Sequence, residues 1–143
     1  DRALATFVMA NGAAAPGQHV TIFFTFWGLN VIKKERKPRV AKDLMGRMFG
    51  WMMPSSSRTL PLSKMNMLGL GWRMMRQRMK DKRVDSLEAM RSEALRQGVE
   101  FIACQMSMDV MGVKREELLD NITVGGVASY MERAEQANVN LFI

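Results

Sequence analysis

The sequence predicts an α/β protein in which helices cover both faces of a mainly parallel sheet. Two near-continuous apolar runs, Val20–Trp27 and Val99–Cys104, are typical of strands buried on both faces. Segments with helical periodicity precede and follow these runs, and alternating strands and helices imply right-handed crossovers between parallel strands. We therefore expect three layers in the order α/β/α.

The first elements follow from periodicity and from chain-breaking residues. Apolar side chains at spacings of three and four predict a helix over Arg2–Ala15, which ends at Pro16 and Gly17. The strand Val20–Trp27 should end at Gly28. A sheet of this kind ordinarily has a strand that leads into the first helix, and here the helix begins at the first residues. We expect that strand to be missing from this chain.

The middle of the chain, at about residues 30–84, is rich in Met and in basic residues and has the character of an excursion from the domain. Its several prolines bracket a short helix expected at Asp43–Met53. A second helical pattern, Leu62–Lys82, combines an apolar Met-rich stripe with basic side chains.

Regular alternation returns in the second half. Ser86 can cap a helix that runs to Gln97, and Gly98 can end it before the strand Val99–Cys104. The remaining expected elements are short helices at Ser107–Met111 and Lys114–Leu119, a short strand at Ile122–Val124, a helix at Val127–Ala137 and a last strand at Val139–Ile143.

Composition indicates one domain, residues 1–143, because 143 residues with 48% hydrophobic content can build a sizeable core. A single cysteine gives no disulfide framework, and the amino terminus lacks a signal-peptide pattern. No apolar run reaches the roughly 18 residues of a membrane span. A cytoplasmic location follows, with peripheral membrane association as an alternative.

The net charge of +7 is concentrated in two basic clusters, at residues 33–39 and 73–83. The favoured interpretation is a solvent-exposed face, and an anionic partner or a membrane surface is the alternative. Aromatic residues are not interleaved with these clusters, so we expect no nucleic acid as a partner.

Cys104, the single cysteine, ends an apolar strand and precedes a short helix. Ligands and reactive groups gather at the carboxyl ends of parallel strands, and backbone N–H groups at a helix start favour a thiolate. The alternative is that Cys104 is a buried small hydrophobic residue of the core. Its position makes a reactive role the stronger hypothesis.

Several kinds of cysteine chemistry are disfavoured. His19, the one histidine, precedes a strand, so it should lie at the opposite edge of a parallel sheet from Cys104, too far for a Cys–His dyad. One cysteine and one distant histidine do not make a zinc site, and a single thiol cannot close a disulfide within the chain. Nucleotide-binding glycine patterns are absent, so no cofactor or metal is expected. Single-thiol chemistry remains: a persulfide, or a mixed disulfide with a partner.

The 15 methionines are the strongest anomaly of composition. Core filling explains many of them, but flexible thioethers also suit adaptable binding surfaces. Basic residues beside Met74, Met75 and Met79 would suit a partner protein or an anionic lipid surface.

Five stretches together resemble the DsrE/DsrF-like family, and more closely its branch found beside or fused to rhodanese, TusA-like and CoA-disulfide reductase modules. The match spans nearly the whole chain. Its residues are Ala10–Ala13, Thr21–Leu29, Leu62–Gly69, Ala103–Gly112 and Gly125–Val127.

The resemblance implies a doubly wound, flavodoxin-like sheet, homo-oligomers, and a cysteine that carries sulfur as a persulfide at the position of Cys104. It also implies a strand before the first helix. Sulfur donor and acceptor proteins, rhodanese-like or TusA-like, would be the partners. The expected site rim comprises Gln105, Met106, Ser107, Met108, Asp109, Trp27, Gly28 and Leu29.

The leading hypothesis is a sulfur-relay protein, closer to a carrier than to a high-turnover sulfurtransferase. The alternative is an assembly or docking module in which the thiol is incidental and the basic Met-rich segment binds a partner protein or a membrane surface.

Overall fold

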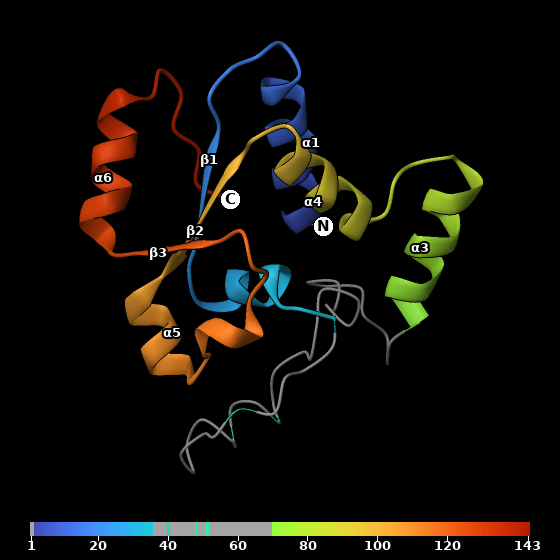
Figure 1. Cartoon of the computed structure of the whole chain (residues 1–143). Helices are drawn as coiled ribbons and strands as arrows, with labels where there is room; N and C mark the ends of the chain where they lie inside the picture. The colour runs from blue at the N-terminus through green and yellow to red at the C-terminus, as the bar shows by residue number, and fades with distance from the viewer. Residues whose placement is uncertain (1, 36–39, 41–47, 49–50, 52–69) are drawn as a thin grey trace.

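The computed structural model describes residues 2–35, 40, 48, 51 and 70–143 (Figure 1). It is a mixed α/β fold, as the sequence predicts. Of the expected helix at Asp43–Met53, only Met48 and Trp51 are described, and both are helical. The first part of the expected Leu62–Lys82 helix lies outside the described residues.

A three-stranded parallel sheet in the order β1-β2-β3 forms the centre of the fold. The strands are β1 (Thr21–Phe24), β2 (Glu100–Cys104) and β3 (Thr123–Gly125). Thr21 pairs with Glu100 and Phe24 with Ala103, while Cys104 pairs with Gly125. All the carboxyl ends therefore lie at one edge of the sheet, with β2 in the middle.

Helices cover both faces of the sheet, with α1 (Arg2–Ala14) and α4 (Leu87–Arg96) packed together on one side and α6 (Val127–Gln136) on the other (Figure 1). On the α1 side, the rings of Phe7, Phe24 and Phe101 form a cluster with centroids 5.3–6.5 Å apart. On the α6 side, Tyr130 packs on Phe23 at 5.4 Å. Neighbouring β1 residues thus face opposite layers, as a strand requires.

The helix bounds follow their caps. The Ser86 hydroxyl accepts a hydrogen bond from the Ala89 N–H at 3.2 Å, which starts α4 one residue later. Gly98 takes a φ of +81°, a value that glycine adopts without steric cost, and the chain turns there into β2. The described part of the basic segment is α3 (Leu70–Asp81), joined to α4 by the Arg76–Glu88 ion pair at 3.1 Å.

The strand predicted over Val20–Trp27 is shorter than expected. Phe26 has a φ of 42°, in the left-handed region, and the chain leaves the sheet there to form the 3-10 helix η1 (Phe26–Ile32). Leu29, Val31 and Ile32 are buried in the core. Hydrophobicity predicts burial of this run but does not separate a strand from a buried short helix.

Between β2 and β3 the chain forms α5 (Gln105–Met111) and the 3-10 helix η4 (Arg115–Glu117), shorter than the expected Lys114–Leu119 helix. The strand predicted at Val139–Ile143 is wrong: this segment forms no strand, and Phe142 is 98% exposed. Its β-forming composition is not enough, because strand preference depends on packing against neighbours.

Candidate functional site

Cys104 stands at the carboxyl edge of the sheet, where the sequence places it. It is the last residue of β2 and the N-cap of α5, and its side chain makes no capping hydrogen bond. The residue is 1% exposed, so the thiol is covered in this state of the protein. The thiol can react only when the residues that cover it move aside.

The side chain of Cys104 shares the α6 face of the sheet. Phe101 contacts Phe7 on the α1 side, so alternation along β2 directs Ile102 and Cys104 to the other side. The residue paired with Cys104 is Gly125, which has no side chain. A Cβ at Gly125 would lie 3.1 Å from Ile102 Cγ2 and from the Cβ and Oγ of Ser129 on α6. Gly125 therefore lets α6 approach the sheet beside the cysteine.

The residues of α5 divide between its buried and exposed faces. Ser107, Met108 and Met111 are buried, and with Cys104 they form a stripe at spacings of three, four and seven. On the opposite face, the Gln105 amide donates to the Asp109 carboxylate at 2.8 Å, and both residues are exposed. Of the expected rim residues in α5, Ser107 and Met108 thus lie on the buried face with Cys104, whereas Gln105, Met106 and Asp109 face solvent.

The expected rim residues after β1 all belong to η1, which contacts α5. Trp27 is 59% exposed, Gly28 is partly buried and Leu29 is fully buried. The fold therefore brings both groups of expected rim residues to one edge, although Leu29 belongs to the core. Sequence reasoning did not single out Phe26, whose ring is 44% exposed beside Trp27.

Exposed apolar side chains lie on the two elements that follow β1 and β2, and we call them the apolar collar. They come from the start of η1 and from one face of α5, where Met106 and Val110 are one turn apart. The collar consists of Phe26, Trp27, Met106 and Val110.

Buried polar groups hold η1 in place. Lys33 Nζ donates to Asn30 Oδ1 at 2.7 Å, and the Asn30 amide donates to the Trp27 carbonyl at 3.2 Å. From α4, Arg91 donates to the Val31 carbonyl at 2.7 Å. Lys33 is buried, so this one member of the basic cluster at residues 33–39 does not belong to a solvent-exposed face. The signal in the sequence was an Asn and a Lys three residues apart within an apolar run.

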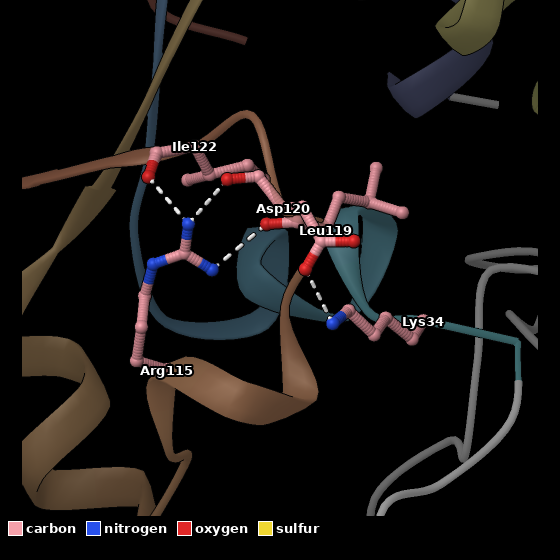
Figure 2. Close-up of polar contacts among 5 residues, drawn as sticks. All are labelled: Lys34, Arg115, Leu119, Asp120 and Ile122. Carbon is pink, nitrogen blue, oxygen red and sulfur yellow. Dashed lines mark hydrogen bonds and ion pairs between the residues drawn. The ribbon is translucent and has the colours of Figure 1, made fainter.

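The connection that leads into β3 is fixed by Arg115 and Lys34 (Figure 2). Arg115 donates to the carbonyl groups of Leu119, Asp120 and Ile122 at 2.8, 2.6 and 2.9 Å. The Lys34 ammonium lies 2.6 Å from Asp120 Oδ1 and lowers the pKa of that carboxyl group. No sequence pattern indicates this role for Arg115, because carbonyl acceptors exist at every position.

The described residues do not bring together the groups that a Cys–His dyad or a metal site needs. His19 is exposed and precedes β1, at the opposite edge of the sheet from Cys104, as expected. The described residues contain no group of three or more His, Cys, Asp or Glu side chains that could hold a metal ion. Nor does any described helix have the length and apolar character needed to cross a membrane.

Comparison with known proteins gives a consistent result. Residues 1–142 match the model of the DsrE/DsrF/DrsH-like family. The chain is 46% identical over 143 residues to the uncharacterized protein YrkE of Bacillus subtilis (strain 168), covering all of this chain and 89% of that protein. It is 35% identical over 147 residues to the sulfur carrier protein DsrE2 of Allochromatium vinosum, covering all of this chain and 91% of that protein. The chain therefore belongs to the DsrE/DsrF/DrsH-like family.

Proposed function

We propose that this protein is a sulfur carrier that holds sulfane sulfur as a persulfide on Cys104 and passes it between partner thiols. The observation that carries the proposal is the position of Cys104, at the carboxyl end of the central strand of a family member whose relative is named a sulfur carrier. Because the chain has one cysteine, the transferred sulfur must come from one partner molecule and leave to another.

The chemistry is two thiol exchanges with no net oxidation. The Cys104 thiolate attacks the outer sulfur of a donor persulfide, a sulfur–sulfur bond forms at Cys104, and the donor leaves as a thiolate. An acceptor thiolate then attacks the outer sulfur, and Cys104 leaves as a thiolate. One sulfur atom moves in each step and the total charge is unchanged.

The apolar collar suits the partner contact that this exchange requires. Cys104 is 1% exposed, whereas Met106 is 54% and Trp27 59% exposed. Methionine side chains repack easily, so Met106 can adapt to a docked partner and help to exclude water from the contact. We infer that donor and acceptor proteins bind here in turn, in a reducing compartment such as the cytoplasm that keeps the thiol available.

Intact-mass measurement after incubation with inorganic polysulfide tests the proposal. The wild-type protein should gain about 32 Da, the mass of one sulfur atom, and lose it on reduction. Cys104→Ser is the matched control and should gain nothing. A wild type that stays unmodified while folded, or a Cys104→Ser variant that gains the same mass, would overturn the proposal.

A second candidate, a docking module, is favoured by α3. This helix carries exposed Met74, Arg78 and Lys80, and Met74 is 71% exposed. A basic helix with exposed apolar residues can bind an anionic lipid surface. Binding to vesicles that contain anionic lipid should weaken as salt rises and be unchanged in Cys104→Ser if docking is independent of the thiol. No binding at low salt would exclude the lipid surface.

Self-association is a further part of the proposal, implied by the family resemblance. Sedimentation at several protein concentrations should show a species heavier than the 16.2 kDa chain. A single monomeric species at all concentrations would contradict it.

A further inference from the structure

Ser107 is a buried polar residue with no assigned task, one helical turn beyond Cys104. It is 0% exposed, and its hydroxyl finds no hydrogen-bond partner among the residues that the structure describes. Serine hydroxyls at helix starts ordinarily bond to nearby backbone groups, and leaving one unpaired in the interior is unfavourable. The Ser107 hydroxyl is therefore available to a group that becomes attached to the neighbouring cysteine.

The helix geometry places Ser107 on the same buried face as the cysteine. Cys104 is the N-cap of α5, and Ser107 is the third residue of the helix. Residues three apart at the start of a helix lie on the same face of it. Their Cβ atoms are separated by roughly 5–6 Å when three residues apart on a helix surface. Both side chains also belong to the buried stripe that includes Met108.

We propose that the Ser107 hydroxyl donates a hydrogen bond to the outer, negatively charged sulfur of the Cys104 persulfide. This rests on the proposed carrier function and names the group that holds the cargo. A second sulfur extends the cysteine side chain by about 2 Å, the length of a sulfur–sulfur bond, and brings charge toward the hydroxyl. The resting thiol makes no such bond, so Ser107 favours the loaded form over the empty one.

The proposal makes the loaded and empty states respond differently to one substitution. In the exchange, a donor persulfide and the Cys104 thiolate give the donor thiolate and the Cys104 persulfide, whose outer sulfur then releases its proton to water and becomes negatively charged. Ser107→Ala removes the hydroxyl that donates a hydrogen bond to the loaded form and leaves the empty form unchanged. The equilibrium constant for loading should therefore fall about tenfold, the effect of one hydrogen bond to a charged group. The rate at which iodoacetamide alkylates the empty thiol should stay within about twofold of wild type.

The experiment equilibrates wild type, Ser107→Ala and Ser92→Ala with one low-molecular-weight persulfide and its thiol at fixed ratios, and measures the loaded fraction by intact mass. Ser92 is an exposed serine on α4, so its variant should load like wild type. Thermal melting of Ser107→Ala should show no loss of stability, because the change removes an unpaired buried hydroxyl.

The outcomes separate this inference from the proposed function. If wild type does not load at all, the carrier function fails and this inference fails with it. If wild type and Ser107→Ala load equally, the inference is wrong and the carrier function stands. A Ser107→Ala variant that melts at a clearly lower temperature would show that the hydroxyl serves the fold, which also overturns the inference.

Discussion

The two faces of the sheet differ in how completely they are covered. On the α1 side, Phe7 and Ala94 are fully buried and Phe101 is 1% exposed. On the α6 side, no residue of α6 is buried, and Met131 is 52% exposed. The fold thus concentrates its apolar packing on one face.

This difference separates stability from access. Cys104 shares the lightly covered face, since alternation along β2 places it with Ile102 toward α6. Regions with few buried apolar contacts open locally at lower free energy than the core. We infer that α6 and the β3 connection can open beside the thiol while the α1 and α4 layer stays folded.

The largest expected loss of stability comes from a substitution on the α1 side of the sheet. Phe101→Ala removes the ring that contacts both Phe7 and Phe24, and should lower the free energy of unfolding by about 3–5 kcal/mol. Tyr130→Ala is the matched change on the α6 face and should cost about 1 kcal/mol, because the Tyr130 ring is 37% exposed and packs mainly on Phe23. Denaturant unfolding followed by circular dichroism measures both. Equal losses would remove the distinction between the faces.

An intermediate effect is expected at the connection to β3. Arg115→Ala removes hydrogen bonds to three carbonyl groups and should cost about 2 kcal/mol. If β3 opens separately from β2, amide hydrogen exchange in Arg115→Ala should become faster mainly in β3 and change least in β2. Arg96→Ala, which removes an exposed arginine that pairs with Glu93, is the control. It should change neither the free energy of unfolding nor the hydrogen-exchange rates of the sheet. Uniform quickening across the sheet would argue for a single opening unit.

The smallest effect concerns acid. The hydrogen bond from Arg133 on α6 lowers the pKa of Glu100 below its ordinary 4.5, burial opposes the shift, and the Thr21 hydroxyl adds to the lowering. Because the folded pKa is the lower one, this stabilisation is complete above pH 4.5 and is lost as pH falls through the folded value.

Arg133→Ala should therefore lower the free energy of unfolding at neutral pH but change it little at a pH below the folded pKa of Glu100. Comparison of unfolding midpoints of wild type and variant across pH checks this. An equal difference at every pH would show that the arginine acts through packing rather than through the carboxylate.

Much of the fold could be predicted from the sequence because its signals are local. Periodicity, the Ser86 cap and the Gly98 stop give α1, α4 and α6 to within a residue or two. The parallel order places Cys104 and His19 at opposite edges of the sheet without knowledge of any contact. The resemblance to the DsrE/DsrF-like family is confirmed by the match over residues 1–142.

The features that were missed depend on tertiary context. The left-handed turn at Phe26 ends β1 early, and nothing in an aromatic run indicates it. Burial of Lys33 requires Asn30 to meet its ammonium, and the absent strand at Val139–Ile143 reflects pairing rather than composition. The burial of Cys104 and the unpaired hydroxyl of Ser107 are likewise properties of packing.

The register of β1 on β2 has a consequence for how the protein is made. Thr21 and Glu100, which face each other across the sheet, are 79 positions apart in the chain. Pairings between residues so distant in the chain form slowly, because the entropy cost of closing a long loop comes before the favourable contacts form. Gly125, which pairs with Cys104, and α6 also come later in the chain, so Cys104 is synthesised before the residues that lie beside it in the fold. We expect the new chain to pass through a period in which its thiol is open to oxidants, and the cell's reducing systems would have to guard it then.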